Sequence, residues 1–408
     1  MSQTTIEPPP EVDSSDQVVW YRNVEILRIV AQVAAVVIVV GLLAWLFNNL
    51  LTNLNRQNIN TDFGFLSRPT NFQISFDEGF DPRSSVWQMV FVGIKNTFLA
   101  GIVGIVIASI VGLIVGIARL SSNWLVAKLA TVYVEAFRNI PPLVIIIFFG
   151  FAIFTFGPVP VLEEATQISW FGSENIALIL SNQRWGIPSL IAEDNVGIFW
   201  MIFIGAIVAA IVVAIYRTRL SDRTGVLHHR VRWALGTFVI IAIAGHFIVG
   251  GAFSASWPQL SENGRRIDEG FVLNFGYIST TLALGLYTAS HVAEIIRGSI
   301  LAVPKGQSEA ANAIALRSFQ RYRYIVLPQA LRIALPPTIN QYLNLIKNTS
   351  LGIAVSYAEI TLLTKTSIGN GRPAPQSIAV LMAVYLLFSL TISFILNLYN
   401  RRIQLVER

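Results

Sequence analysis

The stretch that decides the fold is residues 89–120, MVFVGIKNTFLAGIVGIVIASIVGLIVGIARL, where Lys95 and Arg119 are the only charged residues. A helix needs about 20 apolar residues to cross a hydrocarbon core about 30 Å thick. The block exceeds that length and shows neither a helical stripe nor strand alternation. Residues 89–120 are therefore predicted to form a membrane-spanning helix.

Seven further apolar blocks extend this pattern along the chain. All eight are residues 26–47, 89–120, 130–156, 199–216, 233–253, 273–296, 333–357 and 378–398. Of the 408 residues, 54% are hydrophobic and only 13% are charged, against about 25% charged in soluble domains. The block 333–357 is interrupted by Pro336 and Pro337, so it is assigned partly from its flanks. The sequence predicts an all-α integral membrane protein with eight spans.

The Lys and Arg residues predict the orientation, because cytoplasmic loops hold the excess of these residues. With the N-terminus inside, one set of loops carries 18 of the 29 Lys and Arg residues and the other carries 9; Arg138 and Lys347 lie within spans. Both termini are therefore predicted to face the cytoplasm. The net charge of +6 forms no basic stripe with interleaved aromatic residues, which disfavours nucleic-acid binding.

Composition also limits the chemistry. The chain has no Cys, and its four His are either adjacent (His228 and His229) or isolated (His246 and His291). Neither pattern is typical of a metal site or of a thiol nucleophile. The sequence contains no Gly-x-x-x-x-Gly-Lys-Ser/Thr loop to hold nucleotide phosphates. We therefore predict no catalytic residue, no metal and no cofactor in this chain.

A long polar stretch lies between the sixth and seventh blocks. It is residues 304–328, PKGQSEAANAIALRSFQRYRYIVLP. Pro304 and Gly306 break the preceding helix, and Ser308 as an N-cap with Glu309 in the first turn predicts the start of a short new helix.

Small residues on that helix would let the surface of another protein approach its backbone. They are Ala310, Ala311, Ala313 and Ala315. Leu327 and Pro328 then turn the chain back toward the membrane. From composition alone, the stretch is either a docking element or an ordinary amphipathic helix.

The same stretch resembles the signature of permeases of ATP-binding-cassette importers. That signature is Glu-Ala-Ala, a Gly six residues after the Glu, and Ile-x-Leu-Pro about ten residues further on. Residues 309–311 read Glu-Ala-Ala and residues 325–328 read Ile-Val-Leu-Pro, and Gly306-Gln307 precedes the Glu as in the polar amino-acid branch. Ala315 replaces the family's Gly, and a left-handed backbone there would cost about 1 kcal/mol.

Other stretches carry the resemblance across residues 88–156 and 273–400. They are Asn96-Thr97, residues 133–144 (YVEAFRNIPPLV) and residues 347–351 (KNTSL). The resemblance implies a type I importer permease with a five-helix core, an additional N-terminal helix and an inserted helix pair. The implied parts are a cytoplasmic tail (1–25), an extra transmembrane helix with an external loop (26–87), the first part of the core (88–156), an insertion with two transmembrane helices and external loops (157–272), and the second part of the core (273–408) with a coupling helix at about 304–328.

The resemblance also implies the function and the partners. The chain would be a permease subunit of a bacterial inner-membrane importer, in the long form of the general or neutral amino-acid permeases, moving L-amino acids by alternating access. Its partners would be a dimer of ATPase subunits that bind ATP and Mg, a periplasmic amino-acid-binding protein and a second permease, preferably a distinct one because of the added N-terminal span. The residues that would contact the ATPase are Gly306, Gln307, Glu309, Ala310, Ala311, Ala315, Leu327 and Pro328.

Charged residues inside spans usually face a cavity or a partner, because they are costly in lipid. Glu135 and Arg138, and likewise Glu294 and Arg297, stand three residues apart and so share a helix face. We predict a polar path for a zwitterionic substrate. Its candidate residues are Glu294, Arg138, Lys347, Glu135, His291, Thr349 and Ser350. The alternative is structural ion pairing with side chains that reach the interface, which is favoured for Arg297.

Two other classes of function remain open at this point. A secondary amino-acid transporter driven by an ion gradient would be expected to show two matching halves, and none is evident. An integral membrane enzyme would need a nucleophile with a base, or a metal set. No acidic cluster marks a cationic substrate, so neutral or broad polar amino acids are predicted. The sequence leaves open which amino acids these are and what the insertion 157–272 does.

Overall fold

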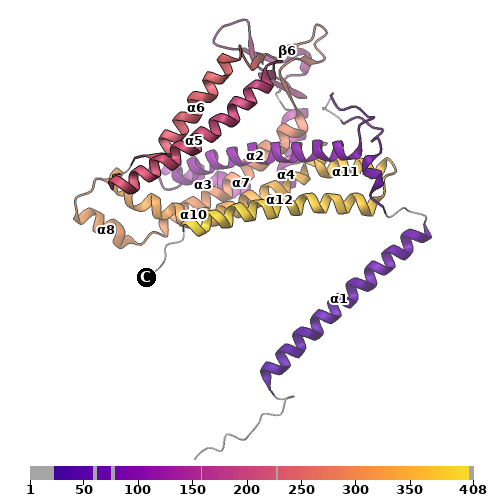
Figure 1. Cartoon of the computed structure of the whole chain (residues 1–408), viewed down its shortest axis with the longest axis horizontal. Helices are drawn as coiled ribbons and strands as arrows, with labels where there is room; N and C mark the ends of the chain where they lie inside the picture. Colours follow the sequence, from indigo (N-terminus) through magenta and orange to yellow (C-terminus); the bar gives the residue numbers. More distant parts are fainter. Residues whose placement is uncertain (1–22, 58–61, 75–78, 158, 227, 404–408) are drawn as a thin grey trace, which may run out of the picture. The chain divides into compact units, whose positions relative to one another are not determined.

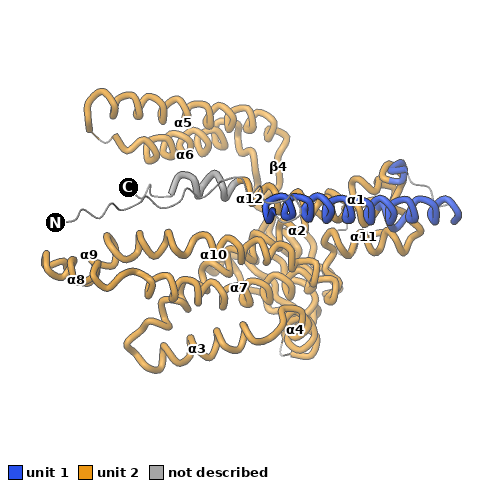
Figure 2. Tube along the Cα trace, turned by 90° about the horizontal axis from the view of Figure 1, so that it is seen from below, with its two compact units in different colours: residues 1–65, 373–376 blue, residues 66–372, 377–408 orange. Residues whose placement is uncertain are grey.

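The computed structural model describes residues 23–57, 62–74, 79–157, 159–226 and 228–403, and the chain divides into two units (Figure 2). Unit 1 is residues 1–65 with 373–376, and unit 2 is residues 66–372 with 377–408. Unit 1 contains α1 (Val24–Arg56), which Asn23 caps by accepting a hydrogen bond from the Glu25 N–H at 3.0 Å. Almost every described side chain of α1 is exposed. A helix that is apolar all round fits a lipid environment.

The centre of unit 2 is α7 (Phe275–Leu301), which packs most extensively against α2 (Val86–Ala118) (Figure 1). Glycines let the two helices approach closely. A Cβ atom on Gly112 would lie 2.7 Å from Cγ1 of Val292, and one on Gly116 would lie 2.8 Å from the carbonyl oxygen of Ala293. Membrane helices are often joined through small residues in this way.

The predicted span 130–156 is bent rather than straight. Its parts are α3 (Trp124–Asn139), α4 (Pro142–Ile147) and the π-helix η2 (Phe148–Thr155). The bend between α3 and the segment Pro142–Thr155 is 106°. Ile140 and Pro141 have extended backbones there, because a residue before proline is driven out of the helical region.

The rest of the core follows α7 in the chain. Its elements are α8 (Lys305–Ala313), α9 (Ser318–Arg321), the π-helix η4 (Tyr322–Val326), α10 (Leu327–Asn348), the 3-10 helix η5 (Thr349–Val355), α11 (Ile360–Gly369) and α12 (Ala374–Ile403). Asn96 joins α2 to the segment before α11: its Nδ2 donates to the carbonyl oxygen of Ala358 at 2.7 Å, and its own carbonyl accepts from the Tyr357 hydroxyl at 2.6 Å.

Five described helices are long and apolar enough to cross a membrane. They are α1, α2, α5 (Val196–Thr224), α6 (Arg230–Ile248) and α12. The number rises to six if α3 and the bent segment α4–η2 are counted together as one span. The remaining two predicted spans fall on α7 and α10, which do not pass this test. Buried serines and threonines on α7 lower its apolarity, and Asn340, Asn344 and Lys347 do the same on α10. Helices that pack against other helices need less apolar surface than helices that face lipid.

The loops of the insertion contain eight short strands that the sequence analysis did not predict. They are β1 (Thr166–Ser169), β2 (Ile176–Leu180), β3 (Arg184–Ile187), β4 (Ser189–Ala192), β5 (Phe253–Ser256), β6 (Gln259–Leu260), β7 (Ile267–Asp268) and β8 (Phe271–Asn274). They pair antiparallel as a sheet β1-β2-β3-β8 and as two-stranded ribbons β4-β5 and β6-β7. Two short 3-10 helices, η1 (Gly64–Ser67) and η3 (Leu162–Glu164), complete the described elements.

Candidate functional site: the coupling segment and the Glu294 cluster

The predicted coupling segment is a short helix followed by a tight turn. α8 begins at Lys305 with Pro304 as its N-cap, so the prediction that Ser308 caps the helix and that Glu309 lies in its first turn is wrong. Pro304 has the fixed φ of proline with an extended ψ, which suits the residue just before a helix. Gln307 in the first turn is linked to the following helix, because Gln329 Nε2 donates to its Oε1 at 3.3 Å.

Ala315 ends α8 in the left-handed conformation, with φ +55°. The Ala315 N–H donates to the carbonyl oxygen of Asn312 at 3.0 Å, and the Leu316 N–H donates to that of Ala311 at 3.1 Å. These two bonds define the Schellman motif, in which glycine is strongly preferred at the position of Ala315. Ala315 therefore adopts the left-handed backbone that costs a residue with a Cβ atom about 1 kcal/mol.

The surface of this segment is largely exposed. Gly306, Glu309, Ala310 and Ala315 are exposed, whereas Ala311 is fully buried against the rest of the chain. The prediction that Ala311 faces a partner is therefore wrong, because that side of α8 packs inward. Two large apolar side chains stand out next to it: Ile314 is 70% exposed and Phe319 is 71% exposed.

Leu327 and Pro328 lie where the π-helix η4 continues directly into α10, and both side chains are exposed. The backbone stays helical there, so the prediction that these two residues turn the chain is wrong. Proline removes one helical N–H donor, and the π-helical turn before it is a common adjustment of a helix around such a position. Between this point and the α2–α3 turn lies an apolar cavity of about 750 Å³, lined among others by Leu120, Val126, Phe319 and Leu327. The predicted coupling segment thus combines an exposed helix with this neighbouring apolar cavity.

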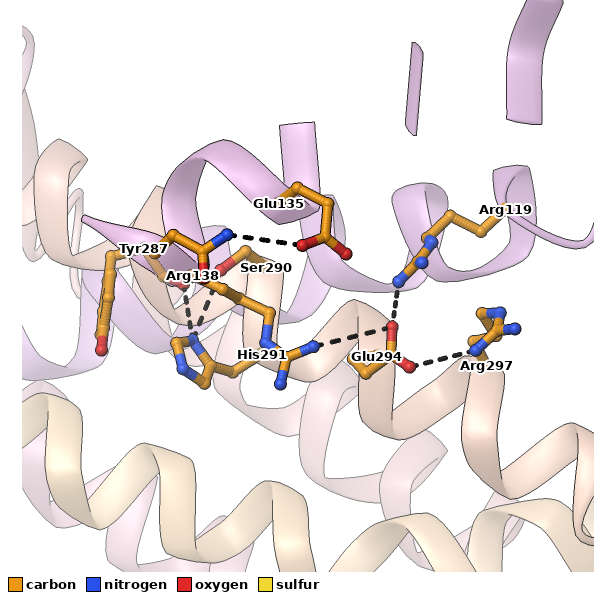
Figure 3. Close-up of polar contacts among 9 residues, drawn as sticks. Arg119, Glu135, Arg138, Tyr287, Ser290, His291, Glu294 and Arg297 are labelled. Carbon is orange, nitrogen blue, oxygen red and sulfur yellow. Dashed lines mark hydrogen bonds and ion pairs between the residues drawn. The ribbon is translucent and has the colours of Figure 1, made fainter. Parts of the chain in front are cut away.

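The charged residues of α7 form the centre of a second site, the Glu294 cluster, defined as Glu294, Arg119, Arg138 and Arg297 (Figure 3). Arg297 Nη1 lies 3.0 Å from Glu294 Oε1. Arg119 Nη1 donates a hydrogen bond to Oε2 of the same carboxylate, and Arg138 Nη1 lies 4.0 Å from that oxygen. Three elements meet here, because Arg119 follows α2, Arg138 lies on α3 and the other two lie on α7.

The cluster carries more positive than negative charge. Three guanidinium groups and one carboxylate give a formal charge of +2 (3 − 1). Arg119 is the least exposed of the three arginines, with 10% of its side chain exposed against 40% for Arg138 and 35% for Arg297. Its Nε has no hydrogen-bond partner among the described residues. A partly buried excess of cations favours an anionic group nearby.

A family model for the inner membrane component of binding-protein-dependent transport systems matches residues 104–405. The chain belongs to that family.

Three relatives resemble this permease over nearly its whole length. A putative amino-acid ABC transporter permease of Escherichia coli is 39% identical, covering 92% of this chain and 94% of the relative. The general L-amino acid transport system permease AapQ of Rhizobium johnstonii is 37% identical, with 92% of each chain covered. The glutamate/glutamine/aspartate/asparagine permease BztB of Rhodobacter capsulatus is 32% identical, covering 93% and 94%. The expectation of a multi-pass importer permease of the type I fold is confirmed.

Other predicted path residues of this permease lie beside the cluster (Figure 3). His291, one turn before Glu294, packs against Tyr287 with ring centroids 4.7 Å apart and ring planes tilted by 51°, and its Nδ1 lies 3.2 Å from the Tyr287 carbonyl oxygen. Glu135 is exposed, and its Oε2 accepts a hydrogen bond from Asn139 Nδ2 at 3.4 Å. Among the described residues, no ion pair joins Glu135 to Arg138, although they stand three residues apart.

The remaining path residues of the permease lie at the end of α10 and the start of η5. Lys347 is exposed. Thr349 is buried, and its hydroxyl donates to the Ile346 carbonyl at 2.7 Å; the Ser350 hydroxyl donates to that of Lys347 at 2.9 Å. No hydrogen bond or ion pair of the described chain connects these three residues to Glu294. The fold therefore brings Arg138 close to Glu294 but leaves Lys347, Thr349 and Ser350 as a separate group.

The residue that sequence reasoning missed is Arg119. It stands at the end of the apolar block 89–120 and was counted only as an orientation signal. Its partner Glu294 is 175 positions away, so no local spacing reveals the pair. The available signal was that an Arg at a span boundary can reach a carboxylate near the same boundary on another span.

Proposed function

We propose that this chain is a permease subunit of an ATP-binding-cassette importer that moves L-amino acids of neutral or broad polar type into the cytoplasm. The observation that carries the proposal is near full-length similarity to three permeases whose names specify amino-acid transport. The chain is a transport subunit, and ATP with Mg binds to the separate ATPase subunits. An ion-driven secondary transporter is the less favoured alternative.

The exposed coupling segment supports the link to an ATPase. α8 presents Glu309 and Ala310 outward, and Phe319 and Ile314 add exposed apolar area close by. Apolar anchors beside a small-residue helix suit docking into a groove of another protein. In the proposal, closure of the ATPase dimer moves this segment and switches which side of the permease is open.

The Glu294 cluster supports a path for amino acids. The excess of two positive charges suits the α-carboxylate of a substrate, and the carboxylate of Glu294 suits its α-amine. Arg138, which is the most exposed of the three arginines and only loosely paired, is the group that can turn to a substrate. His291, Glu135, Lys347, Thr349 and Ser350 are proposed as further path residues.

Reconstituted uptake tests the proposal. Proteoliposomes would contain this chain, a second permease, the ATPase and the binding protein, and uptake of labelled L-glutamine and L-alanine would be followed with and without ATP. We expect uptake only when the ATPase, ATP and the binding protein are all present. Uptake by this chain alone, driven by an ion gradient, would overturn the proposal.

The same preparation addresses the partners and the location. We propose that the second permease is a distinct chain, that the complex lies in the bacterial inner membrane and that both termini face the cytoplasm. Subunit masses of the intact complex distinguish two different permeases from two copies of one. Recovery of two copies of this chain in an active importer would remove the heterodimer from the proposal.

A further inference from the structure

The turn between β1 and β2 carries two exposed aromatic side chains outside the sites above, which we call the aromatic tip. Phe171 is 94% exposed and Trp170 is 51% exposed. Their rings meet edge to face with centroids 5.1 Å apart, and the Trp170 ring lies 5.8 Å from that of Trp257. Trp257 thus supports Trp170, whereas the ring of Phe171 is left almost entirely exposed.

Phe171 holds a backbone conformation that its side chain disfavours. Its φ is +45° and that of Gly172 is +78°, and the Ser173 N–H donates to the carbonyl oxygen of Trp170 at 2.9 Å. Two successive positive φ angles between paired strands are typical of a type I′ turn, whose first central residue is preferably Asn, Asp or Gly. A bulky residue there is an outlier. Because the exposed ring gains little packing within this chain, the strain points to a contact with another molecule.

The surface beside the tip is an open sheet edge with acidic flanks. β1 is an edge strand of the sheet β1-β2-β3-β8, and all four of its residues are exposed. Glu164 lies just before β1, and Glu174 lies just after the tip. Both glutamates are exposed, and neither forms an ion pair with another described residue. The aromatic tip therefore stands between negative charges that no cation of the described chain neutralises.

The strands as a group are also acidic. Residues 159–195 and 252–274 contain eight acidic and three basic residues, which gives a formal charge of −5 (3 − 8). An anionic lipid surface attracts basic segments and repels acidic ones, and a second copy of the same acidic group would be repelled as well. An apolar pocket with a basic rim on another protein suits both the ring and the charges.

The tip lies at the end of the molecule opposite the predicted coupling segment. β8 leads directly into α7, and α8 follows the end of α7. With 27 residues, α7 is about 40 Å long. The sheet that carries the tip and the segment proposed to dock the ATPase are therefore separated by the length of α7. In the proposed function, this places the tip on the side from which substrate is delivered.

We propose that the aromatic tip docks the amino-acid-binding protein of the importer. Phe171 would enter an apolar pocket of that protein, and Glu164 and Glu174 would face basic residues around the pocket. The inference rests on the proposed function, in which a binding protein is a partner of this chain. It adds the surface of contact and the chemistry that the partner presents.

Binding measurements with the importer complex in nanodiscs test the aromatic ring. The probe is the purified binding protein that supports uptake in the reconstituted importer, and the readouts are its Kd and its stimulation of ATP hydrolysis. Phe171→Asn removes the ring and gives the Asn-Gly pair that this turn prefers, so the turn is kept. It should weaken binding on the order of tenfold without changing ATP hydrolysis in the absence of binding protein. Phe171→Tyr keeps an aromatic ring and should bind as the parent does.

A second pair of variants tests the acidic flanks. Glu164→Gln combined with Glu174→Gln should weaken binding several-fold at low salt and much less at high salt, because screening removes the attraction between exposed charges. Glu193→Gln combined with Asp194→Asn, at exposed positions just before α5, removes the same amount of charge. This control should bind as the parent does at both salt concentrations.

A fluorophore distinguishes a protein partner from the lipid bilayer. An environment-sensitive dye on Ser173→Cys should shift its emission when the binding protein is added, and not when the complex is moved from detergent into nanodiscs of anionic lipid. A shift with lipid alone, or parental binding by Phe171→Asn, would overturn docking at the tip while the importer function stands. Uptake and ATP hydrolysis that do not depend on a binding protein would overturn the proposed function, and the docking inference with it.

Discussion

Arg119 at the end of α2 donates a hydrogen bond to the Glu294 carboxylate on α7. The bond ties the ends of the two helices that pack most extensively in unit 2. Arg138 approaches the same oxygen only to 4.0 Å and is far more exposed. The two arginines therefore differ in role: Arg119 holds the helices together, and Arg138 has a side chain that is available to a solute.

Replacing each arginine separates these roles. Arg119→Gln should lower the free energy of unfolding by about 1–3 kcal/mol, because a mostly buried charge-assisted bond is lost. Arg138→Gln should lower it by less than about 1 kcal/mol yet impair uptake. Thermal unfolding in detergent together with reconstituted uptake measures both effects. Equal destabilisation by the two changes would contradict the distinction.

Glu294→Gln should reduce amino-acid uptake at least tenfold while the complex with the ATPase still assembles. The change removes the only negative charge from a cluster of three arginines, so the proposed partner of the substrate amine is lost. Uptake and co-purification with the ATPase are the two measurements, and Glu262→Gln on the exposed turn between β6 and β7 is the matched control. Unchanged transport would remove Glu294 from the path.

Ala315→Gly should stabilise the end of α8 by about 0.5–1 kcal/mol, because glycine adopts a φ of +55° without the Cβ penalty. Ala310→Gly, five residues earlier and inside the helix, should destabilise it by about 1 kcal/mol. Hydrogen exchange of the α8 amides reports both. If both substitutions slow hydrogen exchange, or both speed it, the left-handed backbone of Ala315 does not determine the stability of this end of α8.

Gly112→Ala should cost about 1–3 kcal/mol of stability through overpacking of the α2–α7 contact. The added methyl group would meet Cγ1 of Val292 at 2.7 Å. Gly205→Ala on α5, where nothing lies within 4 Å, should be neutral or slightly stabilising. Thermal unfolding measures each variant. Combining Gly112→Ala with Val292→Ala should recover part of the lost stability, because the clashing side chain is shortened. If the double variant recovers none of it, the contact with Val292 is not the cause of the destabilisation.

The absence of native cysteine makes the membrane orientation directly measurable. Ser173→Cys in the turn between β1 and β2 should react with an impermeant maleimide on intact spheroplasts. Thr224→Cys at the end of α5 should react only after the membrane is opened. Both positions are exposed, so burial does not limit labelling. The reverse pattern would invert the proposed topology.

Much of the fold was predictable because its signals are local. Apolar blocks such as 89–120 and the motif at 304–328 are contiguous. The motif also marked Ala315 as the position where the backbone angle would matter, although it did not fix that angle. The Arg119–Glu294 bond was not predictable, since it joins residues on different helices. The burial of Ala311 depends on tertiary packing, which local sequence does not show. The strands were missed because a segment of two to five residues is too short to show the alternation of polar and apolar residues that indicates a strand. Pro141 and Pro142 carried a signal for the 106° bend that the length of the apolar block concealed.

The strands around the inserted helix pair have a consequence for how such permeases vary. Ile187 on β3 is the register partner of Phe271 on β8, and Ala192 on β4 is the partner of Phe253 on β5. The chain therefore leaves for α5 and returns from α6 through neighbouring strands, and β8 leads directly into α7. If the chain between two paired positions were removed, for example between Ala192 and Phe253, a short turn would be enough to rejoin the backbone. The helix pair α5–α6 is thus joined to the rest of the chain at one place, and its length can change there without relocating α7.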